Sequence, residues 1–307
     1  MNHTMLRQRP FRQVDVFSAE PLRGNPLAVV LDGQDLSDAQ MQAFAAWTQL
    51  SETTFVLPPS PKGLAAGADY RVRIFTPGGE LPFAGHPTLG TAHAWLQAGG
   101  QPRQAGLLLQ ECGVGLVTLR DIGGRRAFAA PPLRRATPDA SGLSAVLDAL
   151  GLAADEVLAA QDLHNGPHWL GLLLPDVATV LSLQPDHAAL QRLGVKVGVA
   201  ARRQAPQGLI RRTSREARAF AGHDDSTDLE VRAFAAATGI AEDPVTGSLN
   251  AALAQWLIAD GHLPSHYRAR QGTALGRAGE VFVQQDTDGH IWVGGEVCDC
   301  ICGTVLL

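Results

Sequence analysis

Arg71-Val72-Arg73-Ile74-Phe75, followed by His86-Pro87-Thr88-Leu89-Gly90, is the stretch that decides the fold, because it occurs twice in degenerate form. The second copy reads Glu230-Val231-Arg232-Ala233-Phe234 and then Asp243-Pro244-Val245-Thr246-Gly247. Each copy continues to a Trp-Leu pair and a glycine, and the spacing in the two copies is nearly equal. A repeat on this scale indicates that the chain consists of two similar halves.

Each copy combines a strand pattern with a helix pattern. Apolar and charged residues alternate over 70–74 and over 229–232, as they do in a half-buried strand. A helix is then predicted from Pro87 to Ala98 and from Pro244 to Ala259, since proline is favoured at the first helical position. The residues just before these prolines, His86 and Asp243, are therefore predicted to be the N-caps.

The two predicted helices are unusual because neither contains an Asp, Glu, Lys or Arg residue. A helix without a charged face is usually buried on all sides. Both are rich in small residues, so a sheet can wrap closely around them. We therefore expect an α+β fold of two pseudo-symmetric domains, each a mixed, curved β-sheet wrapped around a central α-helix.

Further patterns supply the enclosing sheet and an outer helix. Strands are predicted over Phe11–Phe17, Leu27–Leu31, Thr53–Leu57, Leu116–Leu119, His168–Leu174, Val195–Ala200, Val281–Gln284 and Ile291–Val293. A helix is predicted from Asp38 to Leu50, where Ser37 and Gln40 form a capping box. Its apolar face would consist of Met41, Phe44 and Trp47.

The domain boundaries follow from the repeat. The N-terminal domain is expected to span residues 1–130 and to be completed by the last strand, at about 297–307. The C-terminal domain is expected to span 131–296. The Pro- and Arg-rich stretch Pro131–Pro138 is predicted to link the domains, and Arg211–Asp228 is predicted to be an exposed loop.

The composition favours a small-molecule partner. The 307 residues are 45% hydrophobic and carry a formal net charge of -5. This balance gives no electrostatic attraction for nucleic acid or an anionic membrane. No apolar run approaches the roughly 20 residues of a membrane span, and no segment marks the chain for export. We expect no nucleic-acid or membrane partner and a cytoplasmic location.

The cysteines suggest neither disulfides nor a metal site. Cys298, Cys300 and Cys302 alternate near the C-terminus and would share one face of a strand, while Cys112 lies far away in sequence. Neighbouring same-face positions are too far apart for ideal disulfide geometry, and no zinc-ligand spacing is present. Buried, reduced thiols and no metal are therefore predicted.

The starts of the two buried helices indicate where a ligand binds. If the halves pack with pseudo-twofold symmetry, both amino ends would point into one cleft between the domains. Unpaired N–H groups and the positive end of each helix dipole favour a carboxylate there. The glycines Gly90 and Gly247 would let a ligand approach the backbone closely. We therefore expect a carboxylate-bearing substrate.

Three polar residues would meet at this point. They are His86 and Asp243 at the helix starts and Glu52, which lies between the end of one helix and the start of a strand. Each also has a structural interpretation, because an aspartate at a helix start is commonly a cap worth about 1 kcal/mol and a glutamate after a helix is commonly exposed. The repeat favours the functional interpretation, since it predicts that all three converge.

At these residues the sequence resembles the PhzF-like family, named for a phenazine biosynthesis isomerase, and more distantly diaminopimelate epimerase. The resemblance covers nearly the whole chain. It rests on Asp15–Phe17, Gly24–Val30, Ser51–Phe55, Arg73–Pro77, Glu80–Thr88, Glu242–Ser248, Gln271-Gly272 and Gly276-Arg277. It implies the epimerase-like fold, an active site in the cleft between the domains, no cofactor and a homodimer.

The resemblance also implies roles for individual residues. Glu52 would move a proton between substrate carbons, while His86 and Asp243 would orient the substrate as catalytic partners. Its carboxylate would be held by backbone N–H groups near Gly85, Gly247 and Ser248. Thr88 and Asn25, which lie in matching motifs, are predicted to contact the substrate as well.

One departure from the epimerases affects the predicted chemistry. Those relatives carry a cysteine at each helix start, whereas this chain has His86 and Asp243 there. Two-thiol racemisation is therefore disfavoured, and a single carboxylate that removes and returns a proton on one face suits an isomerisation. An amino-acid epimerase that uses Glu52 with another base, and a catalytically silent binding protein, remain alternatives. The sequence leaves the substrate open.

Overall fold

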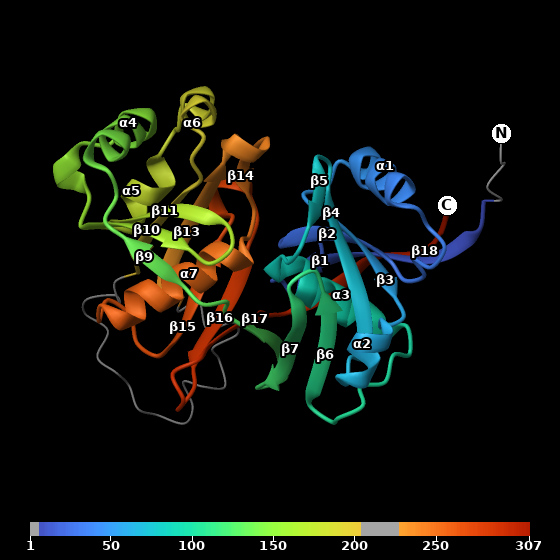
Figure 1. Cartoon of the computed structure of the whole chain (residues 1–307). Coiled ribbons are helices and arrows are strands. Elements are labelled where there is room, and N and C mark those ends of the chain that lie inside the picture. Colours follow the sequence, from blue (N-terminus) through green and yellow to red (C-terminus); the bar gives the residue numbers. More distant parts are fainter. Residues whose placement is uncertain (1–5, 204–226) are drawn as a thin grey trace.

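The computed structural model describes residues 6–203 and 227–307. The fold is α+β, with a mixed sheet and few helices, and Figure 1 shows its elements gathered in two lobes. The predicted loop 211–228 lies almost wholly outside the described residues. Among the helices of the described ranges, none has the length and apolar character needed to cross a bilayer.

The first lobe is built from the N-terminal half of the chain. Its strands are β1 (Gln8–Val16), β2 (Asn25–Val30), β3 (Thr53–Leu57), β4 (Tyr70–Thr76), β5 (Gly79–Leu81), β6 (Leu107–Cys112), β7 (Gly115–Ile122) and β8 (Arg125–Ala129). Its helices are α1 (Asp38–Thr48), α2 (Pro61–Ala65) and α3 (Gly85–Gln97). Helix α3 is the central one, buried along most of its length.

The second lobe repeats this plan. Its strands are β9 (Arg134–Ala136), β10 (Ala159–His164), β11 (His168–Leu174), β12 (Val197–Arg202), β13 (Leu229–Ala235), β14 (Ile240–Asp243), β15 (His266–Gln271), β16 (Gly279–Gln285) and β17 (Ile291–Gly295). Its helices are α4 (Ala140–Leu150), α5 (Val177–Ser182), α6 (His187–Leu193) and α7 (Gly247–Ala259), with 3-10 turns at Ala154–Glu156, Ala236–Thr238 and Thr273–Leu275. Helix α7 is the buried counterpart of α3.

The strand pairings show that the whole lobe is duplicated. In the first lobe β2 runs parallel to β3 and β4 parallel to β6, and β3 and β4 are antiparallel. In the second lobe β11 runs parallel to β12 and β13 parallel to β15, and β12 and β13 are antiparallel. Because order and direction match element by element, the local repeat extends to a pseudo-symmetric architecture.

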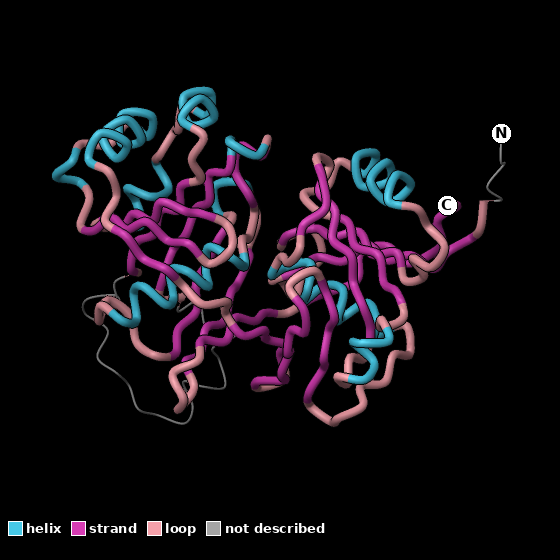
Figure 2. The backbone as a smooth tube through the Cα atoms, viewed as in Figure 1, coloured by secondary structure: helices cyan, strands magenta, loops and turns pink. Residues whose placement is uncertain are grey.

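Two pairings involve strands that join the lobes. β8 pairs with β17 of the other lobe, so strands run from one lobe into the other, as Figure 2 shows. The last strand, β18 (Val297–Leu306), returns to pair with β1 along its whole length. The domain division 1–130 with 297–307, and 131–296, is therefore our proposal for the boundaries, supported by the return of β18.

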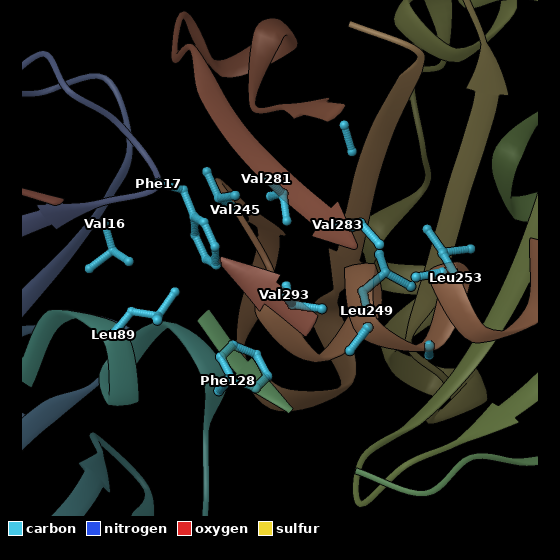
Figure 3. Close-up of a cluster of buried hydrophobic side chains, with 14 of the residues drawn as sticks. Val16, Phe17, Leu89, Phe128, Val245, Leu249, Leu253, Val281, Val283 and Val293 are labelled. Atoms are coloured by element: carbon cyan, nitrogen blue, oxygen red, sulfur yellow. The ribbon is translucent and has the colours of Figure 1, made fainter. Parts of the chain in front are cut away.

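One hydrophobic core runs through both lobes. It contains Leu89 of α3, Phe128 of β8, Leu249 of α7 and Val293 of β17, all fully buried. Figure 3 shows these side chains in a continuous cluster around the point where β8 and β17 meet. Since apolar burial stabilises by roughly 25 cal/mol per Å², this shared core stabilises the contact between the lobes. Each lobe also has one smaller core beneath its outer helices.

Most predicted elements are confirmed. Thr53–Leu57 and His168–Leu174 are strands with the predicted bounds, and the other predicted strands agree within a few residues. The capping box of Ser37 and Gln40 is present at the start of α1. The predicted apolar face of α1 is wrong at Trp47, which is 78% exposed and stacks on Phe44 with ring centroids 6.0 Å apart.

The predicted N-caps are wrong. α3 begins at Gly85 after Ala84, so His86 lies inside its first turn. α7 begins at Gly247 after Thr246, because Asp243 is still the last residue of β14. Pro87 still lies in the first turn of α3, where its missing N–H is tolerated because backbone N–H groups there have no intrahelical partner.

The predicted burial of the cysteines is also wrong in part. All four thiols are free, as expected, but Cys112, Cys298 and Cys300 are only half-buried and Cys302 is exposed. Cys298 and Cys300 lie in the partly exposed first half of β18, Cys302 lies in its largely exposed second half, and Cys112 lies at the partly exposed end of β6. The predicted linker at 131–138 contains β9, which pairs with β10 and is therefore part of the sheet.

Candidate active site

The amino ends of α3 and α7 touch each other. A Cβ atom placed on Gly247 would lie 3.2 Å from both the Gly85 Cα and the His86 backbone nitrogen. A Cβ placed on Gly85 would lie 3.3 Å from the Gly247 Cα and 2.6 Å from the Phe128 ring. Glycine at both helix starts is thus what allows the two backbones to meet. Two positive dipole ends at one point favour an anion.

Glu52 faces this point from the residue just before β3. Its Oε2 lies 3.5 Å from Nε2 of His86, and the two side chains are 15% and 5% exposed. Neither atom has a hydrogen-bond partner among residues 6–203 and 227–307. Burial raises the pKa of Glu52 to about 8, with a further contribution from the negative charge of Asp243, while the charge of Lys196 acts in the opposite direction. At neutral pH this carboxyl group is mostly protonated.

His86 is a neutral imidazole at physiological pH. Burial lowers its pKa to about 3, although a hydrogen bond with the backbone of Pro26 opposes the shift. Proline has no N–H, so the imidazole donates to the Pro26 carbonyl. Since Nε2 has no hydrogen-bond partner among the residues that the structure describes, we infer that Nδ1 is the donor. The lone pair of Nε2 then faces the protonated carboxyl group of Glu52.

Asp243 is held by side chains from both lobes. Its Oδ1 accepts from Nδ2 of Asn25 at 2.9 Å, and its Oδ2 accepts from Oγ1 of Thr246 at 2.5 Å. Burial raises the pKa of Asp243 to about 6, and these two hydrogen bonds limit the rise. Asp243 is therefore mostly ionised at neutral pH. Asn25 also donates to the Val245 carbonyl at 2.8 Å, which ties β2 to the turn before α7.

Gln271 supports this turn from β15. Its Oε1 accepts from the Thr246 backbone N–H at 3.0 Å and from Nδ2 of Asn250 at 2.8 Å. Its Nε2 donates to the Asp243 carbonyl at 3.0 Å and to Oγ1 of Thr246 at 3.1 Å. Gln271 thus fixes both ends of the turn, a role that its motif in the sequence did not reveal.

The remaining predicted site residues differ in their surroundings. Ser248 lies in the first turn of α7, where its Oγ accepts from Nε1 of Trp169 at 3.3 Å. Thr88 is fully buried, and its Oγ1 accepts from Nε2 of Gln110 at 3.0 Å. The structure thus brings Glu52, His86 and Asp243 together, whereas it gives Thr88 a partner in the core.

Sequence patterns missed one charged residue that acts on the site. Lys196 precedes β12, is half-buried, and lowers the pKa of both Glu52 and Asp243 through its charge. Burial in turn lowers the pKa of Lys196. A signal was available, because Lys196 stands before its strand as Glu52 stands before β3.

Comparison with known proteins identifies the family of the chain. The model of the PhzC-PhzF family, described as phenazine biosynthesis-like protein, matches residues 14–296. The chain belongs to this family. Its relatives include trans-2,3-dihydro-3-hydroxyanthranilate isomerase of Pseudomonas chlororaphis, 33% identical over 278 residues that cover 89% of each chain. Antisense-enhancing sequence 1 of Schizosaccharomyces pombe is 32% identical over 315 residues, covering 97% of this chain and 99% of that protein.

Solved structures of the PhzF family have the same fold. A family member from Enterococcus faecalis superimposes with a TM-score of 0.75 at 26% identity, covering 98% of this chain and all of that one. A hydroxyproline epimerase from Agrobacterium vitis superimposes with a TM-score of 0.60 at 13% identity, over 100% of this chain and 94% of that one. The latter likeness concerns the fold alone.

Proposed function

We propose that the chain is an isomerase of the PhzF type, which shifts a proton within a small carboxylate-bearing substrate. One observation carries the proposal. The buried Glu52 carboxyl group lies beside the touching amino ends of α3 and α7, and its Oε2 has no hydrogen-bond partner in the described part of the chain. An unpaired buried carboxyl oxygen is costly, so its persistence favours a catalytic role over a structural one.

In the proposed reaction, Glu52 acts first as a base and then as an acid. With a pKa of about 8, roughly a tenth of the molecules carry an ionised Glu52 at pH 7. This carboxylate is a stronger base than an ordinary glutamate. It removes a proton from a substrate carbon, and the electron pair enters the conjugated system of the substrate. The same carboxyl group then returns the proton to another carbon on the same face.

The neighbouring groups stabilise and orient the substrate. The N–H groups of the two helix starts would hold the substrate carboxylate and the charge that develops during proton transfer. Asp243, mostly ionised, would accept hydrogen bonds from an amino or hydroxyl group. His86 stays neutral, so its Nε2 can take up the proton of Glu52 only transiently.

The relatives suggest the substrate class. The Pseudomonas proteins are named for a dihydro-hydroxyanthranilate, a ring that carries a carboxylate, an amino group and a hydroxyl group. A cyclic amino carboxylate therefore suits the donors and acceptors of this site. We also propose that the protein works in the cytoplasm as a homodimer and without a cofactor.

A deuterium-exchange screen tests the proposal. Cyclic and amino carboxylic acids are incubated with the protein in D₂O, and proton NMR records which C–H signals disappear. Glu52→Gln should abolish exchange while the protein stays folded. Asp155→Asn removes an exposed carboxylate far from Glu52 in sequence and should leave the exchange rate unchanged. Full activity of Glu52→Gln would exclude Glu52 from the mechanism.

An epimerase remains a second candidate because the site contains two buried carboxyl groups. Glu52 and Asp243 have raised pKa values of about 8 and about 6, so one can donate a proton while the other accepts one. Such a two-base reaction would invert a stereocentre. Chiral chromatography of the product distinguishes inversion from a shifted double bond.

A further inference from the structure

Lys196 is the pseudo-symmetric counterpart of Glu52. In the first lobe Thr53 of β3 pairs with Phe75 of β4. In the second lobe Val197 of β12 pairs with Phe234 of β13. Phe75 and Phe234 close the two copies of the sequence repeat, so the registers coincide. The residue before β3 therefore corresponds to the residue before β12.

Lys196 lies beside Trp169, a residue that contacts the start of α7. Leu170 pairs with Val197 in the parallel strands β11 and β12, which makes Trp169 and Lys196 neighbours. The Nζ atom of Lys196 lies 5.0 Å from the centre of the Trp169 ring, and Nε1 of the same ring donates to Oγ of Ser248. The Lys196 carbonyl accepts from the Leu170 N–H at 2.8 Å, which fixes the backbone.

The charge of Lys196 acts on both carboxyl groups without neutralising either by contact. It lowers the pKa of Glu52 and of Asp243, and the two carboxyl groups raise the pKa of Lys196 against the effect of burial. Within residues 6–203 and 227–307 its ammonium group forms no ion pair. Since burial disfavours the charged form of Lys196, an added anion beside the ammonium group would stabilise it.

A substrate carboxylate meets two opposing fields at this site. The helix amino ends attract it, whereas ionised Asp243 repels it. Among the described residues, Lys196 is the cation whose charge lowers the pKa of both Glu52 and Asp243. It can therefore offset the repulsion from Asp243.

We propose that Lys196 is a substrate-binding residue that holds the carboxylate of the substrate against the amino end of α7, at the position that Glu52 occupies in the other lobe. This inference rests on the proposed function and deepens it, because it assigns the residue that selects an anionic substrate. The indole of Trp169 attracts the ammonium group by a cation–π interaction and limits its movement. The duplicated position has thus diverged into a proton carrier in one lobe and an anion binder in the other.

A binding experiment with a charged and a neutral probe tests this assignment. Anthranilate is a planar amino carboxylate, and anthranilamide has the same shape without the charge. Isothermal titration with both probes is carried out on the wild type, Lys196→Met and Lys196→Arg. Lys62→Met serves as the matched control, because Lys62 is exposed on α2.

The wild type and Lys62→Met should bind anthranilate more tightly than anthranilamide. Lys196→Met should weaken anthranilate about 10- to 100-fold, as expected for a charge-assisted hydrogen bond, and leave anthranilamide unchanged. Lys196→Arg should retain the preference for the acid. Equal anthranilate affinity in Lys196→Met and the wild type would overturn the assignment, as would a wild type that does not prefer the acid to the amide.

A second readout excludes a merely structural effect. If Lys196 acts through its charge, its removal should raise the pKa of Glu52 further and move the pH profile of exchange to higher pH. An unchanged profile would also count against the assignment. Failure of the proposed isomerase function would show differently, as absent exchange in a wild type that still binds anthranilate through Lys196.

Discussion

The ionisation of Glu52 should be visible in the pH dependence of folding. Its pKa in the folded protein, about 8, lies above the unfolded value of 4.5, so the folded state binds this proton more tightly. The resulting stabilisation is complete below about pH 4.5 and is lost as the pH rises through about 8. The contribution of Glu52 to stability should therefore fall across this window.

His86 and Asp243 contribute little to the pH dependence of stability in the upper part of this window. The pKa of His86 is depressed from 6.5 to about 3, so its contribution is lost only as the pH falls and is constant above about pH 6.5. The pKa of Asp243 is raised to about 6, and its contribution has largely disappeared by about pH 6.5. Above that pH, Glu52 is the site carboxyl that still titrates.

The expected magnitude follows from one proton. One pH unit corresponds to at most about 1.4 kcal/mol for a single group, so raising the pH from about 6.5 to about 8.5 should cost the wild type about 2 kcal/mol. Glu52→Gln has the same shape and no titration. It should lack this loss. The stability difference between Glu52→Gln and the wild type should therefore shift in favour of Glu52→Gln by about 2 kcal/mol between the lower and the higher pH.

Urea denaturation at the two pH values, followed by circular dichroism, measures the difference. The Asp155→Asn control should show the same loss as the wild type, which separates Glu52 from exposed carboxylates. An equal loss of stability in Glu52→Gln and the wild type would refute the raised pKa and, with it, the basis for a strong carboxylate base.

Three further predictions follow from the same geometry. If Glu52 begins as a base, kcat/KM for exchange should rise with pH up to about 8; a decline through that range would show that Glu52 begins as an acid. Gly247→Ala should lower the free energy of unfolding, measured by urea denaturation, by about 1 to 3 kcal/mol, because the added Cβ would press on the start of α3. Gly142→Ala should be tolerated, since its Cβ would meet only Asp139 at 3.5 Å, and equal costs in the two variants would refute a tight contact between α3 and α7. Arg232→Met should lower the free energy of unfolding by about 3 to 5 kcal/mol, because it leaves the buried Glu242 unpaired. The corresponding Arg73→Met breaks a more exposed pair with Glu80 and should lower it by about 1 kcal/mol or less, and similar losses in the two variants would contradict the difference in burial.

Helix α3 and helix α7 show how much the sequence determined by itself. Their lack of charged residues, the strands before them and the repetition of both were sufficient to predict two buried helices in two similar lobes. The same symmetry brought Glu52, His86 and Asp243 into one neighbourhood. These features depend on local periodicity and on duplication, both of which can be read along a single chain.

The tertiary structure decided what each of these residues experiences. In the structure, His86 and Asp243 are not the helix caps that the sequence predicted, and Thr88 has a hydrogen-bond partner in the core. Gln271 and Lys196 interact with Asp243, the first through a hydrogen bond to its backbone and the second through its charge. Burial and Coulomb interactions depend on groups that are distant in sequence, such as Asn25 and Asp243, which meet only when the lobes pack. The raised pKa of Glu52 therefore belongs to the folded protein, because no local pattern reports the loss of water around a carboxyl group.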